Sequence, residues 1–580
     1  MKLALAQVNP TVGDFRWNLE IALDAATRAH EAGASLIVYP ELTLTGYPPR
    51  DLLGVGGFVE ECGRTLEEFA RKLPEIRALV GYVYTDDSLP PGMAYNACAA
   101  VAGGEVVTDY RKRLLPQYDV FDEVRYFEPG RRGEILEIDD LHMGLTVCED
   151  IWYGREEIRG YYDHDPVADY IGRVDLLVNL SASPFVAGKP EVRLELLRQT
   201  ARRSNAAVVY VNQVGGNDEL IFDGRSAVLN ARGEVVAMAK AFEEDLLIVD
   251  TDSLTGTAPA GTVQVGTVPS EGGRRLSAEA SGLSPGSTPQ SKPPNPPPEA
   301  RIDDIARALV LGTRDYIHKC GFETAVVGLS GGADSSVVAG LAVEALGASN
   351  VTGILMPSRY SSEHSMVDAE ALSRNLGIRH IAVPIEPMFA AYLDTLGEMF
   401  EGTEPDITEE NLQARIRGAI VMAYANKFGS LLLATSNKSE ASVGYATLYG
   451  DMCGAIGVIV DVVKTDVYKI GRWLNRDGEV IPENVFTKPP SAELKPGQVD
   501  QDALPPYDLL DRIVELHIEQ DKTAAEIVAE GLPETEVREV LRKIRAAEYK
   551  RRQAAPGLKV TGKAFGMGRR FPIAQGYGAG

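Results

Sequence analysis

The sequence predicts an α/β protein built from two domains. Short apolar runs typical of strands alternate with longer segments of helical periodicity, both before residue 255 and after residue 300. Between them, residues 256–300 are rich in proline, glycine and serine, and such a stretch cannot bury enough apolar area to offset its ordering entropy. A chain of 580 residues is also too long for a single ordinary core. We therefore expect a first domain over 1–255, a linker over 256–300 and a second domain over 301–580.

The first domain is expected to be a layered α/β structure. Apolar strands are predicted at 36–39, 143–147, 176–180 and 207–211. Helical segments lie between them, and the first of these spans 17–32 and ends before Gly33. The apolar stretch at the N-terminus is too short for the core of a signal peptide, so we interpret it as the first strand.

The second domain is expected to contain a parallel sheet. Strands predicted at 325–329 and 351–355 flank a helix over 335–346, which is the pattern of a right-handed crossover unit. Ligands of such sheets bind at the carboxyl ends of the strands. From residue 507 onward the pattern is helical and charged, and it ends in a glycine-rich tail for which the sequence predicts no role.

A phosphate site is predicted where the strand at 325–329 meets its helix. The intervening string is Ser330-Gly331-Gly332-Ala333-Asp334-Ser335-Ser336. The glycines let backbone N–H groups approach an anion, the serines add hydroxyl donors, and the helix presents its positive end. Asp334 would repel a phosphate unless a cation lay between them, which indicates a divalent metal ion or a cationic substrate. The chain has no G-x-x-x-x-G-K-[ST] run, so a P-loop of the kinase or GTPase type is not expected.

Composition excludes several classes of function. Lysine and arginine number 58 against 83 aspartates and glutamates, and the net charge of −25 would repel a nucleic-acid backbone. No apolar segment reaches the length of a membrane span, so no membrane partner is expected. The five cysteines show no C-x-x-C spacing, which indicates a reduced, cytoplasmic setting without a zinc site.

Three residues in the first domain suit nucleophilic catalysis. Glu41 and Cys148 follow predicted strands, and Lys112 lies in a basic string between them. A free thiol with a pKa of about 8.5 is only slightly ionised at neutral pH. It therefore needs a carboxylate to accept its proton and a cation to stabilise the charge that develops. Glu41 and Lys112 can supply these two roles.

These motifs resemble two known families. The loop at 330–336 is similar to the pyrophosphate loop of the N-type ATP pyrophosphatases, and Glu41, Lys112 and Cys148 resemble the triad of the nitrilase superfamily. Together, in this order, they resemble the family of glutamine-dependent NAD synthetases over nearly the whole chain apart from the linker. The resemblance implies a nitrilase-like α/β/β/α sandwich as the glutamine amidohydrolase domain. It also implies a Rossmann-like parallel-sheet ATP pyrophosphatase domain that carries the synthetase site.

The resemblance further implies a glutamine pocket near the triad. Its side chains would bind the α-amino and α-carboxylate groups of a zwitterion. They are Tyr118, Glu149, Ser183 and Lys189. Lys189 stands where relatives can carry arginine, so it would make a point-charge contact in place of a bidentate one. Glu123 is a further carboxylate that either polarises the triad or has a structural role in its loop.

In the second domain the resemblance implies ATP, deamido-NAD and Mg²⁺ sites. The residues expected at ATP are Ser330, Gly331, Gly332, Asp334, Ser335, Ser336, Met356, Thr435 and Lys464. Those expected at deamido-NAD are Asn411, Arg415, Asp451 and Lys488, and those expected at Mg²⁺ are Asp334 and Glu440. Ser436 occupies a place often held by glycine, so a positive φ there would be strained. Arg359 is a weaker candidate for the phosphate site.

The function implied is conversion of deamido-NAD to NAD, with ATP as co-substrate and glutamine as nitrogen donor. Glutamine would be opened through a thioester at Cys148, and the acid would be activated as an adenylate. An amidotransferase that adenylates a different acid is the first alternative. The second is a binding or regulatory protein in which one catalytic centre is dead, although the candidate catalytic and metal-binding residues are all intact: Glu41, Lys112, Cys148, Ser330, Asp334 and Glu440. The family usually forms homo-oligomers through the synthetase domain, so a homo-oligomer is expected.

Overall fold

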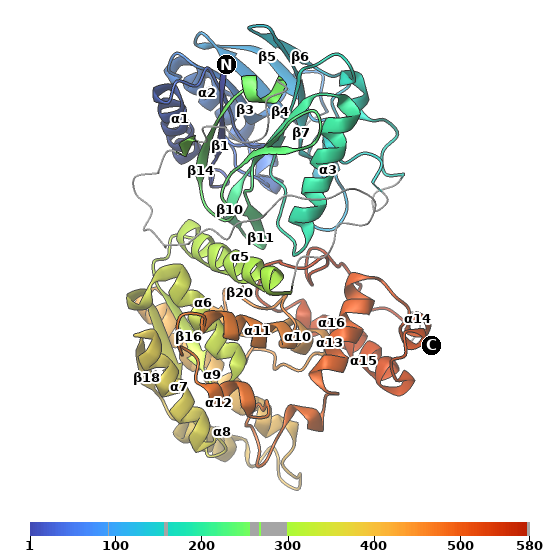
Figure 1. Ribbon diagram of the computed structural model, residues 1–580. Helices are drawn as coiled ribbons and strands as arrows, with labels where there is room; N and C mark the ends of the chain where they lie inside the picture. The colour runs from blue at the N-terminus through green and yellow to red at the C-terminus, as the bar shows by residue number, and fades with distance from the viewer. Residues whose placement is uncertain (91, 156–159, 256–265, 268–297, 577–580) are drawn as a thin grey trace. The chain divides into compact units, whose positions relative to one another are not determined.

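The computed structural model describes residues 1–90, 92–155, 160–255, 266–267 and 298–576 (Figure 1). The expected linker over 256–300 therefore lies almost wholly outside the described residues. The chain divides into two compact units. The first comprises Met1–Asn217 and Phe222–Pro297, and the second comprises Asp218–Ile221 and Pro298–Gly580.

The first unit contains a seven-stranded sheet with the order β15-β14-β1-β2-β3-β4-β5. Its strands are β1 (Lys2–Gln7), β2 (Leu36–Val38), β3 (Arg77–Tyr84), β4 (Tyr95–Ala102), β5 (Glu105–Arg111), β14 (Asp245–Asp250) and β15 (Gly266–Thr267). The central strands β1, β2 and β3 are parallel, and the other neighbours are antiparallel. The parallel register aligns Leu5 with Val38, and Val38 with Leu79.

A six-stranded sheet with the order β13-β12-β9-β8-β7-β6 forms the second layer. Its strands are β6 (Ile135–Ile138), β7 (Leu141–Val147), β8 (Leu176–Ser181), β9 (Ala207–Asn212), β12 (Ala227–Leu229) and β13 (Val235–Met238). β7, β8 and β9 are parallel. A two-stranded pair, β10 (Val214–Asn217) and β11 (Leu220–Asp223), follows β9. The strands expected from the sequence therefore correspond to β1, β2, β7, β8 and β9.

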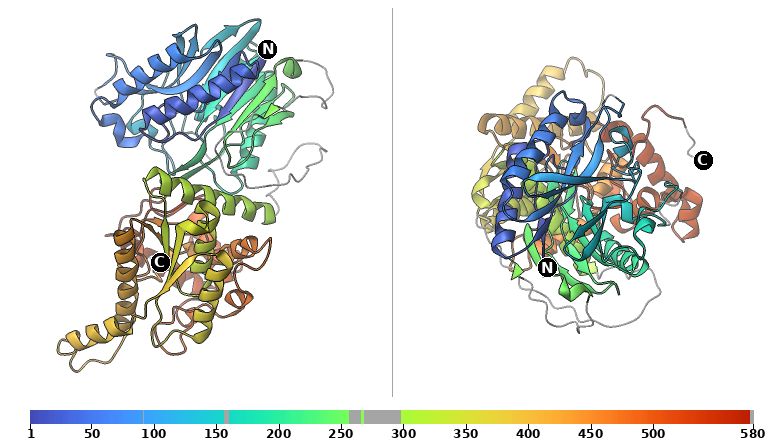
Figure 2. Two further views of the ribbon diagram at one scale, coloured as in Figure 1. Left: turned by 90° about the vertical axis from the view of Figure 1, so that its left-hand side faces the viewer. Right: turned by 90° about the horizontal axis from the view of Figure 1, so that it is seen from above.

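The side chains of neighbouring strand residues show how these layers pack. Val178 joins Leu5 and Val38 in a core cluster that contains residues of both sheets. The adjacent Leu177 points to the opposite face, where it joins Leu197 of α3 (Lys189–Ser204). The outer face of the seven-stranded sheet is covered by α1 (Phe15–Glu31) and α2 (Phe58–Lys72), and Figure 2 shows the same layers from two other sides. The first unit is thus an α/β/β/α sandwich, as expected. Its remaining short helices are η1 (Arg50–Gly54), η2 (Glu123–Arg125), η3 (Cys148–Ile151), η5 (Pro166–Tyr170) and α4 (Asp252–Thr255).

The second unit contains a five-stranded sheet with the order β18-β17-β16-β19-β20, and every neighbouring pair is parallel. Its strands are β16 (Ala325–Leu329), β17 (Val351–Leu355), β18 (Arg379–Ala382), β19 (Leu431–Ala434) and β20 (Ile456–Gly457). The chain moves from β16 outward to β18 and then returns to the other side of β16 at β19. The strand order therefore reverses between β16 and β19, which is where parallel sheets of this kind bind ligands.

Helices surround this sheet and continue into a C-terminal helical part. They are α5 (Pro298–Lys319), α6 (Ala333–Leu346), η6 (Ala348–Asn350), α7 (Glu363–Leu376), α8 (Glu386–Leu396), α9 (Ile407–Phe428), α10 (Lys438–Val443), α11 (Lys464–Leu474), α12 (Glu483–Thr487), η7 (Asp500–Asp502), α13 (Tyr507–Val514), η8 (Glu515–Glu519), α14 (Ala524–Ala529), α15 (Glu534–Ala546) and α16 (Glu548–Arg551). The C-terminal helices form their own core around Leu510, Ile513 and Ile544, and Val443 of α10 belongs to it. This core supports the short helix that carries Glu440.

Among the described residues, no helix combines the length and the apolar character needed to cross a membrane.

Candidate functional site

The first site lies where three strands of the first unit end. Glu41 follows β2, Lys112 directly follows β5, and Cys148 directly follows β7. The Nζ atom of Lys112 lies 2.7 Å from Oε1 of Glu41. All three side chains are buried, with 0 to 5 % of their surface exposed. Residues 41, 112 and 148, which are far apart in the sequence, thus form one buried cluster.

The backbone at Cys148 is left-handed, with φ of 44°. This conformation is costly for a residue with a side chain and occurs mainly where the surrounding structure enforces it. Asp150 supplies part of that support, because its carboxylate accepts hydrogen bonds from Val147 N at 2.8 Å and from Leu114 N at 2.8 Å. Asp150 therefore ties the turn at the thiol to the segment after Lys112. The sequence alone predicts no role for Asp150.

Burial and the charges around the thiol keep it protonated at rest. Burial, together with the carboxylate of Glu41, raises the pKa of Cys148 well above its usual value, while Lys112 acts in the opposite direction. The resting thiol is therefore protonated and needs a base. Burial alone would lower the pKa of Lys112, but the carboxylates of Glu123 and Glu41 outweigh it and raise that pKa. Lys112 stays cationic at neutral pH and can stabilise an oxyanion.

Glu123 is the second carboxylate on Lys112. Its Oε1 atom lies 2.8 Å from Lys112 Nζ and accepts a hydrogen bond from the Tyr47 hydroxyl at 2.8 Å. Its Oε2 atom is buried and has no hydrogen-bond partner among the described residues. Burial raises the pKa of Glu123 to about 7, and the nearby charge of Glu41 acts in the same direction. Of the two roles left open above, this contact with Lys112 favours the electrostatic one.

We expect this pKa to shape the pH dependence of the first site. As the pH falls through about 7, Glu123 takes up a proton and its negative charge beside Glu41 is lost. Lys112 then keeps only one of its two carboxylate partners and the charge arrangement beside the thiol changes, so kcat/KM for glutamine hydrolysis should decrease on the acidic side. Glu123→Gln should lose this acidic limb between about pH 6 and pH 8, with kcat/KM about ten-fold below that of the unmodified protein at pH 8.

The measurement is glutamate release as a function of pH. Glu60→Gln is a suitable control, because Glu60 is an exposed residue of α2. If Glu123→Gln kept an acidic limb with the same midpoint, Glu123 would not be the group that titrates.

The residues expected to bind glutamine differ in their hydrogen-bond partners. The Glu149 carboxylate is buried and accepts a hydrogen bond from the Tyr118 hydroxyl at 2.8 Å. Ser183 is buried and donates its backbone N–H to Asn212 at 2.9 Å. Lys189 lies at the start of α3, where its Nζ atom donates to the Pro184 carbonyl at 3.0 Å. The structure thus brings Tyr118 and Glu149 into direct contact, and it leaves Ser183 and Lys189 on separate partners.

The second site is built on the loop after β16. Gly331 has φ of 75°, and a Cβ atom there would lie 2.1 Å from the Ser365 carbonyl oxygen, so only glycine fits. The Ser330 hydroxyl accepts the Gly332 N–H at 3.2 Å. Ser336 is buried in α6, and its hydroxyl donates to the Gly332 carbonyl at 2.8 Å. This loop leads directly into the N-terminus of α6, as the sequence predicts for a phosphate site.

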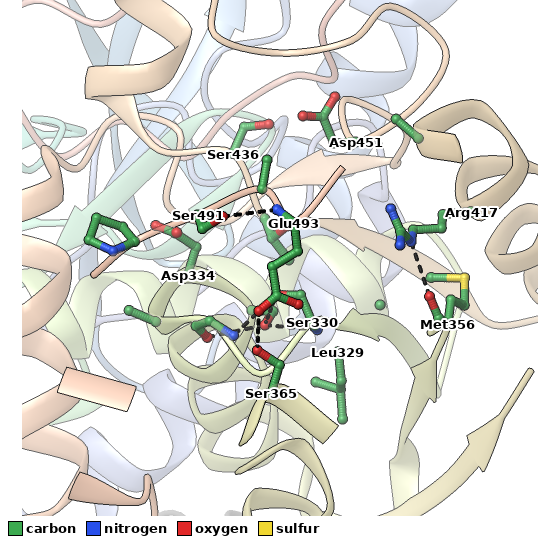
Figure 3. A pocket seen from close by; sticks show the side chains of 18 of the residues that line it. Leu329, Ser330, Asp334, Met356, Ser365, Arg417, Ser436, Asp451, Ser491 and Glu493 are labelled. Carbon is green, nitrogen blue, oxygen red and sulfur yellow. Dashed lines mark hydrogen bonds between the residues drawn. The ribbon is translucent and has the colours of Figure 1, made fainter. Parts of the chain in front are cut away.

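A cavity of about 300 Å³ opens over this loop (Figure 3). The residues predicted at ATP, metal or deamido-NAD that line it are Ser330, Gly332, Asp334, Ser335, Met356, Thr435, Glu440, Asp451, Lys464 and Lys488. Asn411 and Arg415 lie beside the cavity on α9 and contact the loop that carries Asp451. Asn411 accepts the Thr447 hydroxyl at 2.7 Å, and Arg415 donates to the Leu448 carbonyl at 3.2 Å. Arg359 pairs instead with the exposed Glu386.

A lysine bridges the two expected metal ligands. Lys464 Nζ lies 3.1 Å from Glu440 Oε1 and is also hydrogen bonded to Asp334. Asn437 Nδ2 holds the other oxygen of Asp334 at 2.8 Å. The pKa of Glu440 is raised to about 7. Burial is the main cause, the charge of Asp334 acts in the same direction, and Lys464 acts in the opposite direction. The two carboxylates therefore lie close enough to share one cation.

Other predicted side chains of the cavity are held by their neighbours. Burial raises the pKa of Asp451 to about 6, and its Oδ1 atom accepts the Thr447 N–H at 2.6 Å. Lys488 Nζ lies 3.1 Å from Asp368 and 3.2 Å from the Ser365 hydroxyl. Both side chains thus reach the cavity from loops.

The strain considered at Ser436 is absent, because Ser436 is not among the described residues with positive φ. Strain lies instead at Glu493, where φ is 50°. Its carboxylate points to Ser365 in Figure 3 and accepts hydroxyl hydrogen bonds from Ser365 at 2.7 Å and from Ser362 at 2.8 Å. Arg417 also lines the cavity and donates to the Met356 carbonyl at 3.1 Å. The sequence alone predicts no role for Glu493 or Arg417, because neither local pattern differs from that of a surface helix or loop.

A buried lysine links the C-terminal segment to this site. Lys438 follows Asn437 and pairs with Asp461 at 3.0 Å and with Glu519 at 2.9 Å. It also donates to the Thr561 hydroxyl at 2.6 Å. The segment around Thr561, for which the sequence predicts no role, is therefore anchored next to α10.

Comparison with known proteins agrees with this division into two sites. Residues 2–260 match the carbon-nitrogen hydrolase family, and residues 305–554 match the NAD synthase family. A glutamine-dependent NAD(+) synthetase of Thermotoga maritima is 47% identical over 581 residues, which cover 99% of this chain and 98% of that protein. The chain belongs to the family of glutamine-dependent NAD(+) synthetases.

Other members of the family match over similar lengths. The glutamine-dependent NAD(+) synthetase of Synechocystis sp. is 45% identical over 99% of both chains. A solved structure of the Acinetobacter baumannii glutamine-dependent NAD+ synthetase, in complex with ADP, has a TM-score of 0.71 at 35% identity and covers 100% of this chain and 99% of that one. The nitrilase-like fold expected for the first domain and the NAD synthetase fold expected for the second are confirmed.

Proposed function

We propose that the chain converts deamido-NAD, ATP, glutamine and water to NAD, AMP, pyrophosphate and glutamate. Residues 1–255 would form the glutamine amidohydrolase domain and residues 301–580 the synthetase domain. The observation that supports this most directly is the presence of two intact sites on one chain. One is the buried cluster of Glu41, Lys112 and Cys148, and the other is Asp334, Lys464 and Glu440 at the reversal point of a parallel sheet.

At the first site, Cys148 Sγ attacks the side-chain amide carbon of glutamine while Glu41 accepts the thiol proton. The oxyanion that forms lies by the ammonium of Lys112, and Glu41 returns the proton to the leaving nitrogen, so that ammonia departs and a thioester remains. Glu41 then activates a water molecule that cleaves the thioester to glutamate. The 2.7 Å contact between Glu41 and Lys112 supports a base and an oxyanion-stabilising cation that act together.

At the second site, the nicotinate carboxylate of deamido-NAD attacks the α-phosphorus of ATP and displaces pyrophosphate. Ammonia then attacks the acyl carbon of the adenylate, and AMP leaves. The backbone of the Gly331 loop would hold the phosphates, and Lys464 and Lys488 would offset the charge that accumulates on pyrophosphate. Asn411, Arg415 and Asp451 fit a dinucleotide acid and support deamido-NAD over other acids.

The residues present fit a magnesium ion. Lys464 already bridges Asp334 and Glu440, so these carboxylates can share a cation. No group of three or more His, Cys, Asp or Glu side chains suited to a metal occurs among the described residues. This suits Mg²⁺, which takes one or two carboxylates and fills its remaining positions with waters and substrate phosphates. When bound, Mg²⁺ would neutralise phosphate charge and orient the α-phosphate for attack.

The test is a balanced assay of the full chain with deamido-NAD, Mg·ATP and glutamine. We expect NAD, AMP and pyrophosphate in equal amounts, with at least as much glutamate. Absence of AMP and pyrophosphate would refute the proposed synthetase. AMP release with a different carboxylic acid, but not with deamido-NAD, would support the alternative amidotransferase.

The proposal extends to location and assembly. All five cysteines are free, which supports a reducing, cytoplasmic setting. A homo-oligomer formed through the synthetase domain is part of the same proposal, and sedimentation of the purified chain would test it.

A further inference from the structure

The carboxylate next to the nucleophile carries a second phenolic contact that the proposed mechanism does not use. Glu149 Oε1 accepts a hydrogen bond from the Tyr118 hydroxyl at 2.8 Å and another from the Tyr162 hydroxyl at 3.0 Å. Tyr118 precedes Glu149 by 31 residues, and Tyr162 follows it by 13. Two separate loops thus fix the same oxygen atom of one buried carboxylate.

The charge of Glu149 is incompletely balanced. Burial raises its pKa; the two phenols, Lys112 and Lys189 all act to lower it, but together they do not cancel the effect of burial. Glu149 directly follows the proposed nucleophile, Cys148, in the sequence. A carboxylate of this kind favours a cation supplied by the substrate. The only cation of glutamine is its α-ammonium group.

The phenol of Tyr162 orients the Glu149 carboxylate without neutralising its charge. A phenol donates one hydrogen bond and keeps its own proton at neutral pH. Both phenols bind Oε1, so they fix the rotation of the carboxylate and neither of them occupies Oε2. A lysine in the same place would compete with the ammonium of the substrate for the charge.

We propose that Tyr162 is a positioning residue that selects glutamine over amides lacking an α-ammonium group, through its hydrogen bond to Glu149. This inference rests on the proposed glutaminase function of the first site. Tyr162 acts on the binding of the α-ammonium group and takes no part in the steps at Cys148.

Tyr161 provides a matched control on the adjacent position. Its side chain is half exposed, and its ring lies 5.7 Å from the Tyr118 ring, measured between centroids. Its hydroxyl makes no hydrogen bond to Glu149 in the described structure, whereas that of Tyr162 does. Tyr161→Phe and Tyr162→Phe therefore remove the same atom from neighbouring residues, and only the second removes a contact to Glu149.

The experiment compares two substrates with the full chain. One is glutamine, and the other is 4-carbamoylbutanoate, which is glutamine without its α-amino group. For Tyr162→Phe we expect KM for glutamine to rise about ten-fold, equivalent to about 1.4 kcal/mol, with kcat nearly unchanged. Its kcat/KM for 4-carbamoylbutanoate should stay within about two-fold of the unmodified protein, because this substrate has no ammonium group for Glu149 to bind. Tyr161→Phe should change neither substrate's values.

Two outcomes would overturn the inference. Tyr162→Phe could leave the ratio of kcat/KM for the two substrates unchanged, including by lowering both values equally, or Tyr161→Phe could change that ratio as much as Tyr162→Phe does. Failure of the unmodified protein to release glutamate from glutamine would instead refute the proposed function, and this activity is measured first. Synthesis of NAD from ammonium salt should be equal in all three proteins, which shows that each is folded.

Discussion

Replacing Cys148 by alanine is expected to abolish glutamine-dependent NAD synthesis while leaving synthesis from ammonium salt intact. Removing the nucleophile of a catalytic unit typically costs several orders of magnitude, so glutamate release should fall by about 10⁴-fold or more. The synthetase site would be unaffected, because Lys464 and Asp334 belong to the second compact unit. The measurement is NAD formation from deamido-NAD and ATP with either nitrogen donor.

Cys320→Ala is a matched control for this substitution, because Cys320 is an exposed free thiol. It should retain synthesis with both nitrogen donors. Loss of both activities in Cys148→Ala would contradict the division of labour between the domains. Retention of glutamine-dependent synthesis would show that Cys148 is not the nucleophile.

The converse pattern is expected for Asp334→Asn. This substitution removes a carboxylate that contacts Lys464 and Asn437 and would share the metal with Glu440. Loss of one preorganised electrostatic group in an active site costs about 10² to 10³ in rate. We expect about a 10³-fold decrease in AMP and pyrophosphate formation, with glutamine and with ammonium salt alike. Glutamine hydrolysis measured without ATP or deamido-NAD should continue.

Asp477→Asn is the control for charge, because the Asp477 side chain is 90% exposed. Its rates should equal those of the unmodified protein. If Asp334→Asn formed AMP at the normal rate, the assignment of the loop after β16 as the ATP site would be wrong. If it also lost glutamine hydrolysis, the substitution would have disturbed more than its own site.

Several parts of the fold could be predicted because their cause is local. The Gly331 loop lies between an apolar run and a helix start, and its residue types by themselves favour an anion. Glu41 and Cys148 follow short apolar strands, so their place at strand ends could be read from pattern alone. The C-terminal helices also followed from periodicity, although the partners of Thr561 did not.

Other parts of the sites depend on contacts between distant residues. Glu123 of η2 binds Lys112, which follows β5, and Tyr162 reaches Glu149 from a loop whose sequence is ordinary. Arg417 is two residues after Arg415 and therefore lies on another face of α9, and only the packing of that helix shows which face meets the cavity. The same applies to Glu493, whose strained backbone has no signal in its composition.

The sequence by itself determined the order of the two domains, and it predicted the phosphate loop and the roles of Cys148, Glu41 and Lys112 as nucleophile, base and oxyanion-stabilising lysine. The strands and the loop follow from residue type and hydrophobic period, which are properties of neighbouring residues, and the triad roles also depend on the resemblance to the nitrilase superfamily. Only the tertiary structure decided which charges are buried together, as at Lys112 between two carboxylates and at Lys464 between two others. Burial and proximity set a pKa and select an active protonation state, and both arise when the chain folds and brings sequence-distant groups into one low-dielectric site.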